Sequence, residues 1–322
     1  MNNMTQQAMK VVSIINYKGG VGKTTLTANL GAYAAMKGYR VLLIDLDPQT
    51  HLTFSFMTPE YWAKKYADTK TLKNYFEPII KGSTDIPPFS SLTIPLKAGN
   101  FLNINNVKLD LISSHLELIN IDIELAGLLG GTTPSTLAAN SLKVYNYLRN
   151  ELRQVKDDYD LVLIDCPPNF YVMVKNAILS SDYYLVPARL DYLSTLGVTE
   201  LNHKITAYLN QYDEYIKILG DGKYMPVFLT MLGVVPMMVN IAKGDELVSV
   251  QKSYMDSLVG KGIRIFHYVR NNPSVFGSAP FDGVPAVLTR PRFNLTAKRI
   301  ITELYQLGDE FLTAIKLHKR GG

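Results

Sequence analysis

The sequence predicts an α/β fold in which a doubly wound, mostly parallel sheet is flanked by helices. Short apolar runs alternate with helical patterns along most of the chain, as in proteins built on parallel sheets. A glycine-rich segment joins the first run to the first helical pattern, and two later runs end in aspartates. We therefore expect residues 1–322 to form a single domain with an insertion at about 57–110.

The first apolar run, at residues 11–15, is followed by a glycine-rich loop and then by a helical pattern. This order is typical of a phosphate-binding loop, because glycines let backbone N–H groups approach an anion and the helix adds its positive dipole end. Lys23 would supply charge for the β- and γ-phosphates, and Thr24 a hydroxyl ligand for Mg²⁺. The sequence therefore predicts a P-loop NTPase. Its loop consists of Lys18, Gly19, Gly20, Val21, Gly22, Lys23, Thr24 and Thr25.

The loop departs from the pattern G-x-x-x-x-G-K-[ST] at its start. Tyr17 stands where the first glycine of the pattern would fall, and Lys18 follows it. A nucleotide site built within one chain already has Lys23 and needs no second lysine. The departure therefore sets this loop apart from that of an ordinary P-loop protein.

Two predicted strands end in carboxylates. In residues 41–47 the alternation of a strand places Asp45 and Asp47 on the same side. A second apolar run, at residues 159–165, ends at Asp165. The carboxyl ends of such strands are where ligands bind in open α/β sheets. A carboxylate there can ligate Mg²⁺ or orient attacking water in phosphoryl transfer.

The deviant loop, the D-x-D-P-Q sequence at residues 45–49 and the run ending at Asp165 together resemble the ParA/MinD superfamily of ATPases. The resemblance covers nearly the whole chain apart from about residues 57–105. It implies that ATP and Mg²⁺ are bound between two copies of the chain, with Lys18 reaching the nucleotide of the other copy. It also implies that Asp47 positions the hydrolytic water and that Thr24, Asp47 and Asp165 lie around Mg²⁺.

Outside the phosphate-binding segments the family likeness is looser. Asn169, Tyr171 and Lys175 depart from the family's switch segment, where a small residue, a glycine and an apolar residue are usual. The resemblance points to Pro236, Met238 and Asn240 as residues at the rim of the adenine pocket. We therefore expect the base of the nucleotide to be bound at these positions.

Two segments differ in character from the rest of the chain. Residues 57–110 contain Trp62, several tyrosines and two adjacent prolines, and we expect an irregular insertion with a helix at about 71–80. Such an insertion serves either as a surface elaboration or as a partner-docking surface. Near the other end, the spacing of apolar residues predicts an amphipathic helix over about 295–317.

The net charge and the basic residues near the C-terminus suggest DNA as a partner. The formal net charge is +5, which alone is weak evidence for DNA binding. In ParA-like proteins, basic residues near the C-terminus contact DNA phosphates without sequence preference, and dimerisation doubles the contacts. The alternative is a solvated basic face that binds nothing. The candidate DNA-contact residues are Arg290, Arg292, Lys298, Arg299 and Lys316.

The resemblance implies a homodimer that forms on ATP, binds non-specific DNA and is stimulated by a ParB-like activator. Its role would be to position or segregate a plasmid, a chromosome or another large cargo. The alternative is a MinD-like ATPase recruited to membranes, for which the residues after 310 form only a short, faintly amphipathic tail. A metabolic ATP-dependent ligase of the same fold is a third interpretation, although no separate substrate domain is evident.

The remaining composition agrees with a cytoplasmic, nucleoid-associated protein. No apolar run is long enough to span a bilayer, and the first ten residues lack the pattern of a signal peptide. The single cysteine, Cys166, excludes an internal disulfide framework, and we expect it to be a packed small residue.

Overall fold

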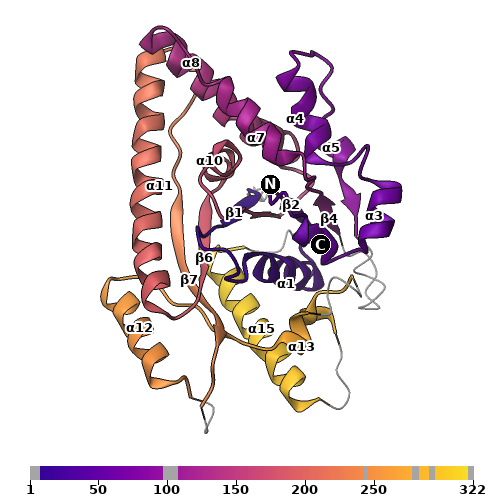
Figure 1. Ribbon diagram of the computed structural model, residues 1–322, viewed down its shortest axis with the longest axis vertical. Helices are drawn as coiled ribbons and strands as arrows, with labels where there is room; N and C mark the ends of the chain where they lie inside the picture. The colour runs from indigo at the N-terminus through magenta and orange to yellow at the C-terminus, as the bar shows by residue number, and fades with distance from the viewer. Residues whose placement is uncertain (1–7, 97–107, 243–245, 278–282, 290–293, 318–322) are drawn as a thin grey trace, which may run out of the picture.

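The computed structural model describes residues 8–96, 108–242, 246–277, 283–289 and 294–317. Within these ranges the apolar runs form an eight-stranded sheet with the order β3-β4-β2-β5-β1-β6-β7-β8 (Figure 1). Neighbouring strands pair in parallel except β3 with β4, so the predicted fold class is confirmed. The strands are β1 (Lys10–Ile14), β2 (Val41–Asp45), β3 (Ile94–Pro95), β4 (Leu109–Ile112), β5 (Leu161–Asp165), β6 (Tyr183–Ala188), β7 (Thr230–Val239) and β8 (Val269–Arg270).

The central strands are buried on both faces, which explains why their sequences are almost continuously apolar. Every residue of β2 and β5 is buried, including Asp45 and Asp165 at their ends. The register pairs Asp165 with Ile14 of β1 on one side and with Asp45 of β2 on the other. The ends of these three strands therefore meet at one edge of the sheet.

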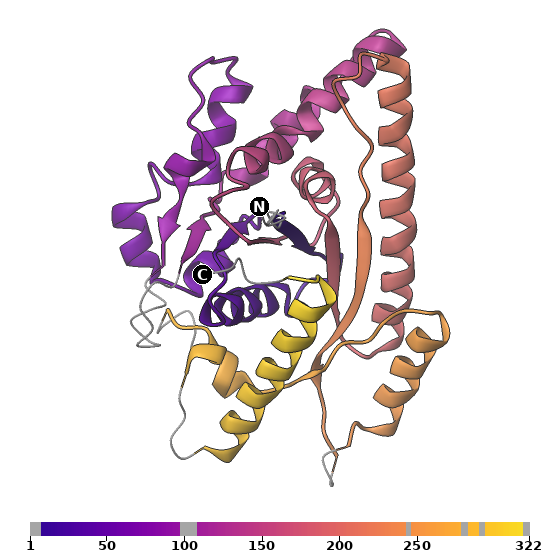
Figure 2. The same ribbon diagram turned by 180° about the vertical axis from the view of Figure 1, so that it is seen from behind.

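Helices cover both faces of the sheet, as Figures 1 and 2 show from opposite sides. One face is covered by α1 (Lys23–Met36), η1 (Ala286–Leu288) and α15 (Leu295–Ala314), whose side chains share a buried cluster. The other face is covered by α4 (Leu72–Ile80), α7 (Leu118–Gly127), α8 (Pro134–Tyr145), α9 (Tyr147–Gln154), α10 (Val172–Ser180) and α11 (Tyr192–Leu219). Further described helices are α2 (His51–Phe54), α3 (Pro59–Lys65), α5 (Phe89–Leu92), α12 (Ser249–Gly260) and α13 (Pro273–Phe276).

The segment 57–110 is more regular than the sequence indicates. The predicted helix at 71–80 is confirmed as α4, which follows Thr71 and buries Tyr75 and Phe76. The segment also contains α3, α5, β3 and the start of β4. Because the described part of this segment forms three helices and a short strand, and β4 then joins the sheet beside β2, the interpretation of this segment as irregular is wrong for the described residues.

The C-terminal helix is shorter than the predicted 295–317. α15 ends at Ala314, and Lys316 follows it in a left-handed conformation with φ of 51°. The apolar stripe of the helix is buried, and the helix packs on α1. The contact is close: a Cβ on Gly308 would collide with the ring of Tyr33 in α1. The stripe comprises Ile300, Leu304, Leu307 and Phe311.

Candidate nucleotide site

The glycine-rich loop lies at the carboxyl end of β1, at the edge where β2 and β5 also end. Gly20 and Gly22 are left-handed, with φ of 65° and 90°, and α1 begins directly after Gly22. A Cβ on Gly22 would come within 2.8 Å of Met237 Cε. Residues with side chains avoid these angles, so glycine is what lets the chain turn into the helix here.

Lys23 is buried at the first position of α1. Its ammonium group donates hydrogen bonds to the carbonyl oxygens of Asn16 at 3.0 Å and Lys18 at 3.1 Å. Desolvation lowers the pKa of Lys23, and the nearby carboxylate of Asp165 acts in the opposite direction. Backbone carbonyls of the loop therefore bind the ammonium group of Lys23 and keep it at the start of the helix.

Thr24 and Asp165 lie in direct contact. The Thr24 hydroxyl donates a hydrogen bond to Asp165 Oδ2 at 2.7 Å, and the Thr27 hydroxyl lies 3.3 Å from Oδ1. Burial raises the pKa of Asp165 to about 7, although the bond from Thr24 opposes the shift. Hard cations such as Mg²⁺ prefer oxygen ligands of these two kinds. The structure thus brings together two of the predicted metal ligands.

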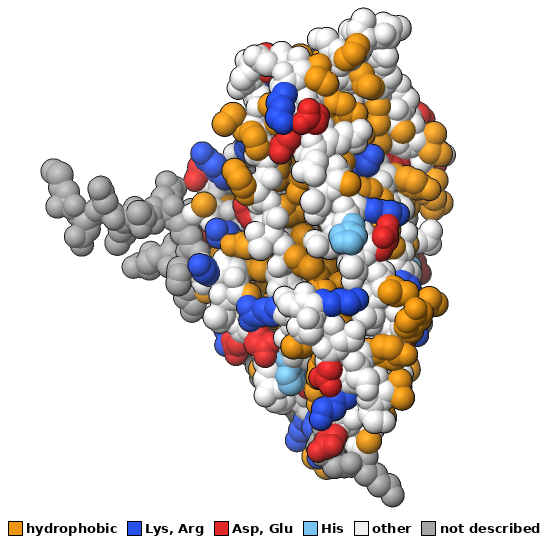
Figure 3. All heavy atoms as spheres, turned by 90° about the vertical axis from the view of Figure 1, so that its left-hand side faces the viewer, with side chains coloured by type: hydrophobic (Ala, Val, Ile, Leu, Met, Phe, Trp, Pro, Cys, Tyr) orange, Lys and Arg blue, Asp and Glu red, His pale blue; other side chains and the backbone are white. Residues whose placement is uncertain are grey.

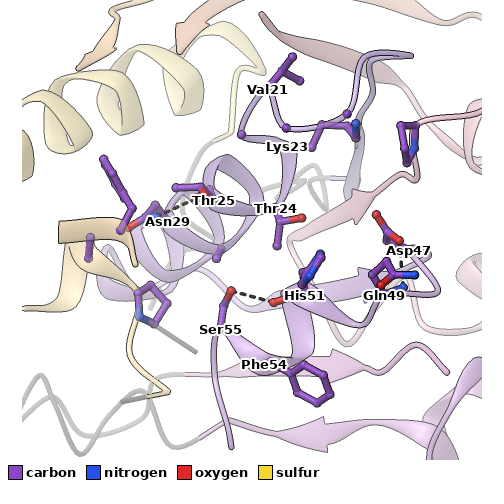
Figure 4. Close-up of a pocket in the computed structure, with 18 of the residues that line it drawn as sticks. Val21, Lys23, Thr24, Thr25, Asn29, Asp47, Gln49, His51, Phe54 and Ser55 are labelled. Carbon is purple, nitrogen blue, oxygen red and sulfur yellow. Dashed lines mark hydrogen bonds between the residues drawn. The ribbon is translucent and has the colours of Figure 1, made fainter. Parts of the chain in front are cut away.

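Asp45 and Asp47 occupy different environments. Asp45 is fully buried and accepts hydrogen bonds from the N–H and hydroxyl of Thr53 and from the N–H of Asp47. Desolvation and the neighbouring Asp165 raise its pKa well above the usual range. Asp47 lines the cavity in front of the loop, and Figure 4 shows it pointing inward. Asp45 therefore holds the segment from which Asp47 extends.

Lys18 is bound within its own chain. Its ammonium group lies 2.9 Å from Asp191 Oδ2 and 3.1 Å from Ser194 Oγ, and Asp191 also caps α11 through the Ser194 N–H. Burial acts to raise the pKa of Asp191, but the hydrogen bonds from Lys18 and Ser194 leave it below the usual value. The lysine is half-exposed, so this contact lies at the surface beside the loop.

A cavity of about 520 Å³ opens in front of the loop (Figure 4). Nothing lies within 4 Å of a Cβ built on Gly19 or Gly20, so the backbone there faces open space. Ligand pockets of small molecules have this order of size, about 300–1,000 Å³. Besides residues 19–25, the wall includes Ala28, Asn29, Asp47, Gln49, His51, Phe54, Met238, Phe276, Pro285 and Ala286.

Of the three residues expected at the base, the structure places only one in the wall of the cavity. Pro236 is buried within β7 and pairs with Ala188 of β6. Asn240 is exposed beyond the strand, and its N–H donates to Gln251. Neither residue lines the cavity, because Pro236 is held inside the sheet and Asn240 lies past the end of β7 at Val239. Met238, the third of the expected rim residues, does line the cavity.

Asn16 is a site residue that the sequence patterns did not identify. Its Nδ2 donates to the carbonyl of Pro187 at 2.8 Å, and its Oδ1 accepts from the N–H of Lys18 at 2.9 Å. Its own carbonyl accepts from Lys23. Asn16 therefore ties the loop to β6. A buried polar residue between an apolar strand and a glycine-rich loop is the signal that could have identified it.

Residues 9–218 match a family model described as an AAA domain, and this range includes the loop, Asp47, Asp165 and Asp191. The chain belongs to this family. It is also ParA-like: the sporulation initiation inhibitor protein Soj of Bacillus subtilis is 28% identical over 283 residues, covering 88% of this chain and 92% of Soj.

Solved structures show the same fold. The McdA protein of Cyanothece superposes with a TM-score of 0.65 at 20% identity, covering 95% of this chain and 99% of McdA. A putative plasmid partition protein of Borrelia burgdorferi, bound to AMPPNP, has a TM-score of 0.59 at 22% identity, with coverage of 95% and 99%. The chain therefore shares the fold of both proteins along nearly its full length.

The candidate DNA-contact residues do not form one cluster. Lys298 and Arg299 are exposed on the first turn of α15, whereas Lys316 is exposed after its end, roughly 25 Å away along the helix axis. Arg290 and Arg292 lie outside the described residues. Figure 3 shows basic and acidic side chains interspersed on the face that carries α11 and α12.

Cys166 is fully buried beside Asp165, and desolvation raises the pKa of its thiol. A buried thiol of this kind is a packing residue, as predicted. Among the described helices, none has the length and apolar character needed to cross a bilayer.

Proposed function

We propose that this chain is an ATPase that uses Mg²⁺ and ATP to switch a ParA-like positioning cycle. The observation that carries the proposal is the contact between Thr24 and Asp165 at the head of a helix that also holds the buried Lys23. Hydroxyl, carboxylate and ammonium groups converge there beside a cavity of nucleotide size. This is the donor set that a magnesium-bound triphosphate requires.

Each loop residue has a role in this proposal. The backbone N–H groups of residues 19–25 and the ammonium group of Lys23 bind the phosphates, and Thr24 and Asp165 hold Mg²⁺. When bound there, Mg²⁺ would supply positive charge beside the phosphate oxygens. Asp47, which also lines the cavity, orients the attacking water, and buried Asp45 keeps its segment in place. The AMPPNP bound to the Borrelia protein supports ATP as the ligand.

The second lysine supports a dimeric ATP state. Lys18 lies at the surface beside the loop, where a second copy of the chain could place its nucleotide within reach. Its contact with Asp191 would have to open for that exchange. We propose that ATP drives this dimerisation and that a ParB-like activator stimulates hydrolysis, which returns the chain to monomers.

The ATP-bound dimer is proposed to bind DNA without sequence preference, as a cytoplasmic, nucleoid-associated protein. Lys298 and Arg299, exposed on α15, are the described residues best placed as a pair to contact phosphates. The cargo would be a plasmid, a chromosome or another large assembly. The description of the Borrelia relative as a putative plasmid partition protein supports this class of role.

The burial of the C-terminal helix argues against the MinD-like alternative, in which that helix would bind a membrane. Membrane recruitment requires an amphipathic helix with a free apolar face. The apolar stripe of α15 is buried against the core, and Ile315 and Leu317 beyond it are buried as well. The described part of the C-terminal segment therefore offers no free apolar face to a bilayer.

Fluorescence anisotropy of labelled random-sequence duplex DNA tests the proposal. Asp47→Ala protein should bind ATP and Mg²⁺ but fail to hydrolyse ATP, which would trap the dimer. We expect tight DNA binding with ATP, weak binding with ADP and a steep loss of affinity as salt rises. Undiminished hydrolysis by Asp47→Ala would reject the role of Asp47. Equal DNA binding with ATP and ADP would reject the switch.

A further inference from the structure

A second cleft, of about 380 Å³, lies at the opposite edge of the sheet from the nucleotide cavity. The nucleotide cavity adjoins residues 19–25, which follow the carboxyl end of β1, whereas this cleft adjoins Val11 near the start of the same strand. Asp182, which also lines the cleft, directly precedes β6. We name it the α9 cleft, because α9 and the turn after it contribute Arg149, Leu152, Arg153 and Lys156 to its wall.

Three basic side chains from one stretch of the chain line the α9 cleft. Arg149 and Arg153 are four residues apart on α9, so they project from the same side of the helix. Lys156 follows three residues later, in the turn after α9. The wall also contains two carboxylates, Asp157 and Asp182, which leaves one positive charge in excess. The basic side chains are therefore gathered beside a hollow rather than spread over an open helix face.

Arg149 is half-buried, and its positive charge is only partly compensated. Its guanidinium group donates a hydrogen bond to the carbonyl oxygen of Met225 at 3.1 Å and lies beside Tyr212. Within the described ranges no ion pair joins Arg149 to a carboxylate. Asp182 is close enough to attract it, but accepts a backbone N–H of β1. Desolvation lowers the pKa of Arg149, and the like charge of Arg153 acts in the same direction.

The compensating charge is more favourably supplied by a ligand than by the chain. A charge withdrawn from water is stabilised by an opposite charge or by hydrogen bonds. Residues 1–7, which precede Ala8 at the wall of the cleft, contain no aspartate or glutamate, so they supply no carboxylate. An anion bound between Arg149 and Arg153 would offset both the desolvation of Arg149 and the repulsion between the two arginines.

The chemistry of the wall indicates which anion fits. A guanidinium group binds phosphate through paired N–H···O bonds, and Arg149 has donors besides the one that bonds Met225. A phosphate group carries about −1.5 to −2 charges at neutral pH and three acceptor oxygens, enough for two arginines and a lysine. Met9 and Leu152 add apolar surface beside them. The volume lies within the range of small-molecule sites, about 300–1,000 Å³.

We propose that the α9 cleft binds a small phosphorylated molecule as a second ligand, separate from the nucleotide. Its phosphate oxygens would contact Arg149 and Arg153, with Lys156 beside them, and its apolar part would pack on Met9 and Leu152. The proposal goes beyond the ATPase cycle and does not depend on it, because the α9 cleft and the nucleotide cavity have no lining residue in common.

Isothermal titration calorimetry of the full chain with phenyl phosphate tests the proposal. Phenyl phosphate joins a phosphate group to an apolar ring, and benzoate joins the same ring to a carboxylate. The titrations are run with saturating Mg²⁺ and AMPPNP and repeated without them, because the phosphate loop also offers a site for a phosphate group. We expect phenyl phosphate to bind in the presence of AMPPNP, at least tenfold more tightly than benzoate, a difference of about 1.4 kcal/mol.

Arg153→Gln is the test variant, because Arg153 is exposed and its replacement leaves the core intact. Arg149→Gln is the second variant, and circular dichroism checks its fold first, since Arg149 bonds Met225. Arg264→Gln is the matched control, because Arg264 is an exposed arginine that lies over Phe266 and does not line the α9 cleft. Each cleft variant should bind phenyl phosphate about tenfold more weakly, whereas Arg264→Gln should match the unchanged chain.

Four results would overturn the proposal. Binding that disappears when Mg²⁺ and AMPPNP are present would assign phenyl phosphate to the nucleotide cavity. Equal affinity for benzoate would mean that the cleft does not select phosphate. Unchanged affinity in both Arg153→Gln and Arg149→Gln would place the ligand elsewhere. The fourth result is no binding of phenyl phosphate; if Arg153→Gln then also weakened binding of duplex DNA, the basic side chains would belong to a nucleic-acid surface instead.

Discussion

Lys18 is the residue whose environment says most about a two-chain mechanism. Its ion pair with Asp191 is 2.9 Å long, and both side chains are 41% exposed. Surface pairs of this kind contribute about 0–1 kcal/mol, because water competes for both charges. The lysine can therefore exchange Asp191 for a phosphate oxygen with little loss of free energy. The weakness of the contact within the chain favours the proposed contact between chains.

Lys18→Ala should separate nucleotide binding from dimer-dependent turnover. Lys23 remains at the helix start, so we expect the affinity of one chain for an ATP analogue to change by less than about threefold, or below 1 kcal/mol. If the active species is a dimer, the specific rate of the unchanged chain rises with protein concentration. In Lys18→Ala that rise should be absent in a steady-state ATPase assay.

The control for Lys18 is Lys81→Ala. Lys81 is also a surface lysine with one carboxylate partner, Glu77, but it follows α4 and does not line the nucleotide cavity. This variant should keep the concentration dependence of the unchanged chain. A Lys18→Ala protein whose specific rate still rises with concentration would contradict the proposed role of Lys18.

Asp165 supplies a pH-dependent test at the same scale. Burial raises its pKa to about 7 in the folded chain, against about 3.9 for an unfolded aspartate. Between these values the native state holds a proton that the unfolded state has lost. The free energy of unfolding without nucleotide and Mg²⁺ should therefore fall as pH rises from about 4 to about 7. The loss is at most roughly 1.4 kcal/mol per pH unit.

Asp165→Asn removes this titration, so its melting temperature should vary less over the same pH range. Asp45, whose pKa is raised by burial and also by the neighbouring Asp165, is present in both proteins; its own contribution has the same sign and becomes smaller in Asp165→Asn, which adds to the expected flattening. Differential scanning fluorimetry from about pH 5 to about pH 8 brackets the folded-state pKa and measures the two curves. Parallel curves would mean that Asp165 does not hold its proton in the native state.

At the scale of elements, the sequence predicted the strands that are buried on both faces. β2 and β5 match the expected runs because a continuous apolar run that ends in Asp is typical of a buried parallel strand. β4 was hidden by Asp110 in its centre. Asp110 is buried because the hydroxyl of Tyr159 donates to it at 2.7 Å, a partner far away in the sequence. Local patterns cannot reveal such a partner.

The candidate site likewise contains residues that the local sequence predicts and residues that depend on distant segments. The phosphate loop, Asp47 and Asp165 depend on local sequence and were placed where the structure has them. The rest of the cavity wall depends on how distant segments meet. Met238 reaches the cavity from a left-handed backbone conformation, with φ of 55°, near the end of β7. Nothing in a strand-like sequence indicates that local turn, so the sequence could not separate Met238 from the nearby Pro236 and Asn240, which were predicted with it.

Packing of α15 on α1 gives a prediction at this scale. Gly308→Ala would place a methyl group against Tyr33, which is buried and fixed by its hydrogen bond to Asp309 at 2.7 Å. Because the ring cannot move freely, we expect a loss of about 1–3 kcal/mol in the free energy of unfolding. Urea denaturation followed by circular dichroism measures it.

Gly197→Ala is the matched control, since Gly197 is also a helical glycine but has nothing within 4 Å of its Cβ position. Alanine favours a helix over glycine by roughly 0.5–1 kcal/mol, so this variant should be neutral or more stable. If both variants changed stability equally, the close approach of α15 and α1 would not be the cause.

For the whole molecule, the charge pattern bears on how DNA could be held. The net charge of +5 is modest, and the face in Figure 3 mixes basic with acidic side chains. A single chain therefore lacks a broad basic surface there. Two copies joined through their nucleotide sites would double the number of phosphate contacts. The dimer would then bind DNA much more tightly than the monomer, whose contacts alone give weak affinity. In the proposed cycle, the nucleotide state would therefore control DNA binding.

The salt dependence of DNA binding tests which contacts are doubled. Each phosphate contact adds about 0.9 to the slope of log K against log salt. Lys298→Ala with Arg299→Ala removes two basic groups from each chain, hence four from a dimer. The slope for Asp47→Ala protein with ATP should therefore fall in magnitude by about 3 to 4. The adjacent pair Lys64 and Lys65 on α3, both exposed, is the matched control. An unchanged slope would assign DNA binding to other residues, whereas a fall of only about 2 would mean that one copy of the dimer contacts DNA.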